Sequence, residues 1–296
     1  MEVAAQPKAA PKKIAIGIGL IAAFAVLIFT VPPALGRDIH PMILVSAFIL
    51  VSVYIVLSFE FLHRSSIALI GAIAIIIAAL AFGSIQAEES FEFIVGAIDY
   101  NTIGLLLGMM IIVAILAESG VFQWVGIKAS KASRGNLWKL MLMLCTFTAV
   151  TSMFIDNVTT ILLMVPVTVA VFRIFRVSPM PFILAQALAS NVGGAATLIG
   201  DPPNIMIGSA ANIDFNAFII HMGPTIAVSF VASLFLLRFM FRKELKAQVQ
   251  NLEQLMKEDE RTYLKDRSIL KKSLGVLFAV IALFVVHGSI SASSHR

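Results

Sequence analysis

The chain contains one cysteine and few charged residues. Because Cys145 is the only cysteine in 296 residues, an intramolecular disulfide and a cysteine-ligated metal cluster are both excluded. Charged residues make up 13% of the chain and apolar residues 59%, and the mean hydropathy is +0.96. Apolar runs repeatedly reach the roughly 20 residues that a helix needs to cross about 30 Å of hydrocarbon. The composition therefore predicts an all-α polytopic membrane protein that lies in a lipid bilayer.

The apolar runs predict about seven transmembrane helices. We expect the spans near 14–31, 41–59, 66–83, 101–118, 180–212 (interrupted), 217–240 and 273–288. Residues 14–120 would form scaffold helices, and 177–241 the interrupted helix with the span that follows it. Residues 272–296 would form the last span and a polar end.

Basic residues are nearly absent from alternate loops, in which Arg37 is the only one. The other loops and the tail 1–13 carry most of the net charge of +5, which is the positive-inside pattern of a multi-pass protein with a cytoplasmic N-terminus. The segments expected in the cytoplasm are the tail 1–13, a basic linker at 121–136 and a polar linker at 242–271. The basic charge thus indicates membrane orientation and no nucleic-acid partner. The first span, which lacks a persuasive cleavage site, is read as a signal anchor.

The polar linker contains apolar residues at helical spacing. Leu245, Val249, Leu252 and Met256 are spaced 4-3-4, which predicts an amphipathic helix within 242–271. We interpret it as a connector on the membrane surface, and a dedicated partner-binding helix is the alternative.

A long apolar stretch between Leu137 and Phe172 has basic segments on both sides. Its only polar cluster is at 154–160, and the second arm, 161–172, holds about a dozen residues. That arm is too short to cross a bilayer at 1.5 Å per residue. We therefore predict a re-entrant hairpin over 137–176 that turns near the midplane at 156–160.

The second irregular element is an interrupted helix with the sequence Asn-Val-Gly-Gly-Ala-Ala-Thr-Leu-Ile-Gly-Asp-Pro-Pro-Asn at 191–204. Proline lacks an N–H and disrupts the interior of a helix, whereas it is tolerated in the first turn. Pro202 and Pro203 therefore indicate the start of a second half-helix. A broken, charged helix in lipid is typical of a binding site for an ion or a polar solute.

The candidate binding residues lie in these two elements. Asp156 and Asp201 are the two acids expected at membrane depth, where a carboxylate among hydroxyl and amide groups can bind Na⁺ and, when protonated, can carry H⁺. The glycines would allow positive φ angles and close approach of a ligand, and the N-terminus of the second half-helix suits an anion. The set comprises Asp156, Asn157, Thr159 and Thr160 in the hairpin, and Asn191, Gly193, Gly194, Thr197, Gly200, Asp201, Pro202, Pro203 and Asn204 in the break, with Asp156, Asn157 and Asp201 as candidate Na⁺ ligands.

The pairing of Asp156-Asn-Val-Thr-Thr160 with Asn191–Asn204 resembles the ArsB/NhaD branch of the ion-transporter superfamily, which includes arsenite permeases, Na⁺/H⁺ antiporters, P-protein-like and citrate-transporter-like proteins. The related divalent anion/sodium symporters have a similar arrangement. The resemblance implies a hairpin tip with Asp156, Asn157 and Thr159 as ligands, opposite a broken helix with Gly193, Gly194, Thr197, Asp201 and Asn204. Such transporters have a second, inverted copy of this unit, so the chain looks like an N-terminal half.

Three functions follow from these observations. The leading hypothesis is a secondary transporter of a small anion or cation, coupled to Na⁺ or H⁺, that acts as one half of a transporter or as a homodimer. No ATP-binding motif or other cofactor site is visible in the sequence. A non-transporting membrane fragment is the second hypothesis. The third is an intramembrane aspartyl protease, disfavoured because Asp201 follows Leu-Ile-Gly and not Gly-x-Gly.

Overall fold

The computed structural model describes residues 11–34, 39–59, 62–86, 88, 90–257 and 259–294. Most of the predicted N-terminal tail, residues 1–10, lies outside the described residues. All regular structure in the described part is helical, as the composition predicts. The chain forms two compact units, Met1–Ile98 and Asp99–Arg296.

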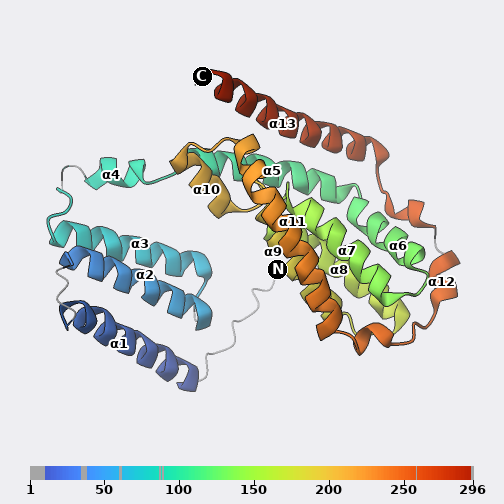
Figure 1. The fold of residues 1–296 in the computed structure, drawn as a ribbon, viewed down its shortest axis with the longest axis horizontal. Helices are drawn as coiled ribbons and strands as arrows, with labels where there is room; N and C mark the ends of the chain where they lie inside the picture. The colour runs from blue at the N-terminus through green and yellow to red at the C-terminus, as the bar shows by residue number, and fades with distance from the viewer. Residues whose placement is uncertain are drawn as a thin grey trace. The chain divides into compact units, whose positions relative to one another are not determined.

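Unit 1 consists of long apolar helices that pack in chain order. It contains α1 (Pro11–Ala34), α2 (Pro41–Phe59), α3 (Arg64–Ala81) and the short α4 (Ser90–Gly96). α2 packs against both α1 and α3 (Figure 1). Gly71 of α3 allows this close contact, since a Cβ there would collide with the side chain of Val53. The opposite faces carry exposed side chains such as Leu69, as expected of helices that face lipid.

Unit 2 contains the two segments for which the sequence predicts a hairpin and an interrupted helix. Its elements are α5 (Tyr100–Glu118), α6 (Val121–Ser133), α7 (Leu137–Ser152), α8 (Asn157–Phe175), α9 (Met180–Gly194), α10 (Pro202–Ala211), α11 (Phe215–Met240), η1 (Glu244–Lys246), α12 (Leu252–Lys257), η2 (Glu260–Tyr263) and α13 (Arg267–Ser294). α9 packs along α7 and also contacts α8 and α11, so it lies at the centre of this unit (Figure 1).

Six described helices are long and apolar enough to cross a bilayer. They are Pro41–Phe59, Arg64–Ala81, Tyr100–Glu118, Asn157–Phe175, Phe215–Met240 and Arg267–Val286, with shorter apolar helices at Ile14–Thr30 and Leu137–Ser152. Five of the six coincide with predicted spans. The sixth, α8, was expected to be too short.

The core of unit 2 lies among α6, α7, α8 and α9. Phe172 of α8 stacks on Phe182 of α9, with ring centroids 3.9 Å apart, and both rings are fully buried. α6 contributes the buried Phe122 and Ile127 to the same core. The segment 121–136, which the sequence predicts to be a basic linker, is therefore a packed helix for most of its length. Its basic residues did not indicate the buried face.

The segment between α11 and α13 differs from the amphipathic helix that the 4-3-4 spacing predicts. It consists of short helical turns joined by extended residues, and we refer to residues 244–266 as the strap. The backbone N–H of Gln250 and the side chain of Asn251 donate to the last carbonyls of α8, at Phe175 and Ile174, at 3.2 Å each. Leu255 is fully buried. The strap is thus bound to the ends of other helices. It does not form one continuous helix, because these contacts hold it in short separate turns.

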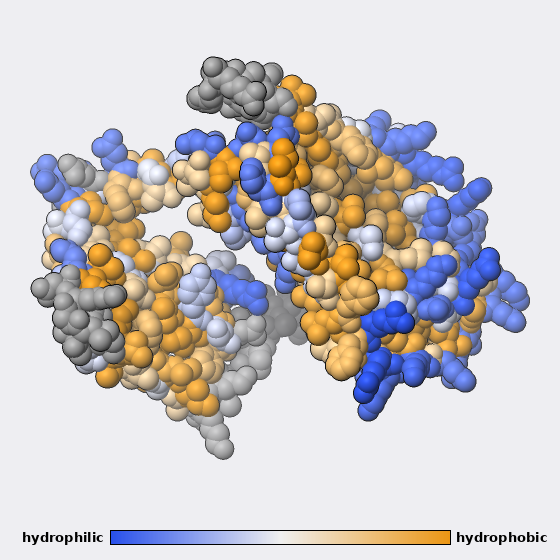
Figure 2. All heavy atoms as spheres, viewed as in Figure 1, coloured by the Kyte–Doolittle hydropathy of each residue, from blue (hydrophilic) through white to orange (hydrophobic). Residues whose placement is uncertain are grey.

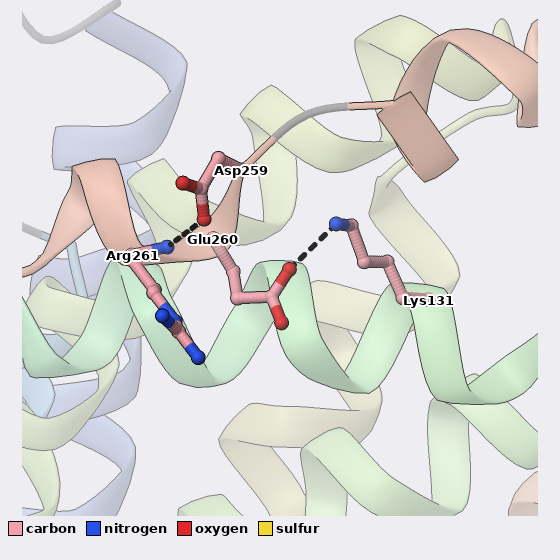
Figure 3. Close-up of polar contacts among 4 residues, drawn as sticks. All are labelled: Lys131, Asp259, Glu260 and Arg261. Atoms are coloured by element: carbon pink, nitrogen blue, oxygen red, sulfur yellow. Dashed lines mark hydrogen bonds and ion pairs between the residues drawn. The ribbon is translucent and has the colours of Figure 1, made fainter.

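An ion pair ties the strap to α6. The Lys131 ammonium lies 2.5 Å from a carboxylate oxygen of Glu260, while the Asp259 side chain accepts a bond from the backbone N–H of Arg261 (Figure 3). Figure 2 shows hydrophilic residues gathered at the end of unit 2 near α6 and α12, and hydrophobic residues over α2 and α3. In this view, hydrophilic residues of unit 2 cover the end that carries the strap.

Candidate functional site

The predicted hairpin is formed by α7, a short turn and α8. The Asp156 carboxylate accepts hydrogen bonds from the N–H groups of Val158 (2.9 Å) and Thr159 (3.2 Å), which caps the N-terminus of α8. The helix therefore begins at Asn157, and the residues expected in the turn form its first turn. The second arm is 19 residues long. The expectation of an arm too short to cross a bilayer was wrong, because the capped polar residues extend the helix.

The predicted interruption lies between α9 and α10. α9 continues to Gly194, and α10 begins with Pro202 and Pro203, as predicted for prolines that open a half-helix. Asp201 occupies the N-cap position of α10, yet its side chain makes no capping bond. The connection is held from within, because the Asn204 amide donates to the carbonyls of Gly194 (3.2 Å) and Thr197 (2.9 Å).

The tip of the hairpin meets the break of the helix through three polar side chains. The amide nitrogen of Asn157 lies 3.1 Å from the Asn191 side-chain oxygen and 3.5 Å from an Asp201 carboxylate oxygen. Asn157 and Asp201 are half-buried and Asn191 is exposed. A second link joins the buried Thr197 hydroxyl to the Met153 carbonyl. Residues separated by 34 to 44 positions in the sequence thus form one polar site.

Two serines that the sequence reasoning missed hold these elements together. The Ser152 hydroxyl donates to the Ser190 carbonyl at 2.8 Å, and the Ser190 hydroxyl lies 3.0 Å from the Asn157 carbonyl. Both side chains are fully buried. Ser190 directly precedes Asn191, but only the packing of α7 against α9 distinguishes these serines from others in the chain.

The glycines of the break serve close packing. Among the described glycines, only Gly83, Gly120 and Gly135 have positive φ angles, so the expectation of positive φ at Gly193, Gly194 and Gly200 was wrong. A Cβ at Gly193 would collide with the backbone of Ala149, and a Cβ at Gly200 with the carbonyls of Gly194 and Ser152. The small residues allow α7, α9 and the break to approach backbone to backbone.

The remaining predicted residues of the hairpin have different surroundings. The Thr160 side chain is fully buried and its hydroxyl lies 3.5 Å from the Ile155 carbonyl. Thr159 and Asp156 face a small cleft between α5 and the hairpin, whose other lining residues are Leu106, Met109, Met110, Val113, Ile155 and Ile199. Thr160 therefore packs in the core, while Thr159 remains accessible beside Asp156.

The site offers oxygen atoms and one available carboxylate. The Asp156 carboxylate is already bound to backbone N–H groups, whereas Asp201 receives only the long contact from Asn157. In the described part no cluster of three or more histidine, cysteine or acidic side chains has metal-binding geometry. A carboxylate with amide oxygens suits a hard monovalent cation such as Na⁺, and the N-terminus of α10 favours an anion.

Comparison with known proteins assigns this architecture to a family. Residues 54–294 match the profile of the family described as citrate transporter, CitMHS, a range that includes both the hairpin and the broken helix. An uncharacterized transporter of Mycobacterium bovis is 36% identical over 246 residues, which cover 83% of this chain and 56% of that protein.

Other relatives agree with this assignment. The 46 kDa membrane protein of Mycobacterium leprae is 37% identical over 234 residues, 79% of this chain and 54% of its own length. The human P protein is 37% identical over 212 residues, 70% of this chain and 25% of its own length. The chain spans about half the length of the mycobacterial relatives. The profile and the name of the Mycobacterium bovis protein both describe membrane transporters. The chain belongs to the citrate transporter family.

Proposed function

We propose that the chain is part of a secondary active transporter that moves a small anion, with a carboxylate of the citrate class as the first candidate, coupled to Na⁺ or H⁺. The observation that carries the proposal is the contact of Asn157 with Asn191 and Asp201, where a hairpin tip meets a broken helix. Discontinuous elements of this kind typically form the binding sites of secondary transporters. The alternatives are transport of arsenite and exchange of Na⁺ for H⁺, which are the other activities of the ArsB/NhaD branch.

Each side of the site has a separate chemical role in this proposal. The positive end of the α10 helix dipole lies at the break and attracts an anionic group of the substrate. The Asp201 carboxylate, with the Asn191 amide oxygen beside it, binds the coupling cation. A cation next to the carboxylate cancels its repulsion of the anion, so that binding of the two solutes becomes mutually favourable.

The proposed orientation follows from the basic residues of unit 2. We place the end of unit 2 that carries the strap in the cytoplasm, because basic residues gather in the cytoplasmic loops of membrane proteins. The hairpin then enters from the cytoplasmic side, and its tip and the helix break lie at membrane depth.

Flux measurements in proteoliposomes test the proposal. We expect labelled citrate to accumulate when an inward Na⁺ or H⁺ gradient is imposed, with arsenite and a pH-sensitive dye as parallel assays. Asp201→Asn removes the charge that binds the cation and should lower the initial rate about tenfold or more, since a hydrogen bond to a charged group contributes about 1.5–3 kcal/mol.

Asp214→Asn is the matched control. Asp214 caps α11 by accepting a bond from the Ala217 N–H, and an asparagine caps equally well, so this variant loses the same charge away from the site. Equal rates in the Asp201→Asn protein and the native chain would contradict the proposal. A native chain that moves none of the three cargoes would favour the non-transporting fragment.

A further inference from the structure

Both tryptophans of the chain carry a basic side chain on the ring. The Arg238 guanidinium lies 5.2 Å from the ring centroid of Trp138, and the Lys128 ammonium 4.3 Å from that of Trp124. Trp138 lies at the start of α7 and Arg238 near the end of α11, so the first pair joins two helices. Attraction between a cation and the face of an indole ring holds such a pair together.

Arg238 lies where the core-facing stripe of α11 borders its lipid-facing surface. Leu234, Leu237 and Phe241 pack against the core of unit 2 at helical spacing. Phe235 and Phe239, 67% and 71% exposed, lie on the outer face. Since α11 is long and apolar enough to span a bilayer, we expect this outer face to contact acyl chains and Arg238 to lie near the headgroups.

The positive charge at this position remains available. Among the described residues no carboxylate forms an ion pair with Arg238 or with Arg242. Arg242 follows the end of α11, and its guanidinium lies 5.4 Å from the ring centroid of Phe239. The exposed Lys139 directly follows Trp138 on α7.

We propose that Trp138, Arg238 and Arg242 form a binding site for the headgroup of an anionic phospholipid, whose acyl chains lie along Phe235 and Phe239. A guanidinium donates two parallel hydrogen bonds to phosphate oxygens, and an indole ring is well suited to the boundary between headgroups and hydrocarbon. Charge complementarity and the adjoining exposed aromatic residues together select a lipid of negative charge.

Quenching of tryptophan fluorescence by brominated lipid tests this site. The Trp124→Phe variant, with Trp138 as its only tryptophan, is reconstituted in nanodiscs of phosphatidylglycerol and phosphatidylcholine. In one sample the acyl chains of the phosphatidylglycerol are brominated, and in the other those of an equal mole fraction of phosphatidylcholine are brominated. We expect enrichment of phosphatidylglycerol at the ring by about fivefold, the effect of one basic residue near an anionic surface. Equal quenching by the two lipids would overturn the proposal.

Charge variants distinguish a specific lipid site at Arg238 from a general attraction of anionic lipid to the basic surface. Arg238→Gln in the Trp124→Phe background should abolish the excess quenching, and Arg238→Lys, which keeps the charge but loses the paired donors, should reduce it. Lys243→Gln removes an exposed charge three residues after Met240 and should leave the excess intact. An unchanged excess in Arg238→Gln, or an equal loss in Lys243→Gln, would overturn the assignment to Arg238.

Discussion

At the scale of single residues, the two acids of the site differ in what their carboxylates contact. Asp156 accepts two backbone bonds at the start of α8, whereas Asp201 makes no capping bond to α10. The sequence places both acids at helix ends and does not distinguish them. The contacts indicate a cap at Asp156 and a carboxylate available to a ligand at Asp201.

The first prediction concerns the cap of α8. Asp156→Ala should lower the free energy of unfolding by about 1 kcal/mol, because two N–H groups lose their acceptor, whereas Asp156→Asn keeps an acceptor and should change it by only a few tenths. Denaturant titration in detergent micelles, followed by circular dichroism, measures the difference. Equal stability of the two variants would show that the capping bonds contribute nothing.

At the scale of elements, the strap connects α11 to α13 while it covers the end of α8 and pairs with α6. Three kinds of contact attach it: the hydrogen bonds of Gln250 and Asn251 to α8, the burial of Leu255, and the ion pair of Lys131 with Glu260. The Lys265 N–H also donates to the Ser119 carbonyl at the end of α5, at 3.0 Å. The strap therefore joins or contacts the ends of five helices, namely α5, α6, α8, α11 and α13.

The second prediction is that the strap detaches more readily in acid. The hydrogen bond from Lys131 lowers the pKa of Glu260 below its ordinary value of 4.5. Because the folded pKa is the lower one, the pair stabilises the attached strap fully above about pH 4.5 and loses this effect as pH falls through the folded value. Hydrogen exchange of residues 250–266 should therefore be faster in Glu260→Gln than in the native chain near neutral pH.

The difference in exchange rate between the two proteins should disappear in acid. Because both proteins are measured at the same pH, the intrinsic pH dependence of exchange cancels in this comparison. Glu253→Gln is the control, since Glu253 is an exposed carboxylate of the same segment. If the Glu260→Gln and native proteins exchanged equally at neutral pH, the ion pair would have no part in holding the strap.

At the scale of the whole molecule, one half of a family member's length already contains a hairpin and a broken helix in contact. The site residues come from α8, α9 and the connection before α10, all within unit 2. The buried serines and the close glycine contacts hold α7, α8, α9 and the break together. Contacts within unit 2 bring Asn157, Asn191 and Asp201 together.

The third prediction follows from this preformed site. If Na⁺ binds at Asp201, a concentration ten times the Kd should stabilise the folded chain by about 1.4 kcal/mol and raise Tm by about 2–4 °C. Thermal unfolding in NaCl and in choline chloride of equal ionic strength measures the shift. Asp201→Asn should lose it and Asp214→Asn should keep it. The same shift in both salts would exclude a Na⁺ site.

Much of the architecture could be predicted from the sequence because it depends on local properties. The lengths of the apolar runs predict the long helices, and Pro202 and Pro203 predict where α10 begins, since a missing N–H acts within its own turn. The start of α8 was misjudged, because Asn157-Val-Thr-Thr160 is polar as a sequence and becomes helical only once Asp156 caps it. The same holds for α6, whose buried face is hidden by its basic residues.

By itself, the sequence determined that this is an all-helical membrane protein with a polar hairpin and a broken helix, since hydropathy and proline act locally along the chain. The tertiary structure alone decided that Asn157 meets Asn191 and Asp201, that Ser152 and Ser190 join α7 to α9, and that the break glycines pack against backbone. These contacts join residues far apart in sequence. They depend on how closely α7 and α9 approach, and no local pattern in either segment determines that distance.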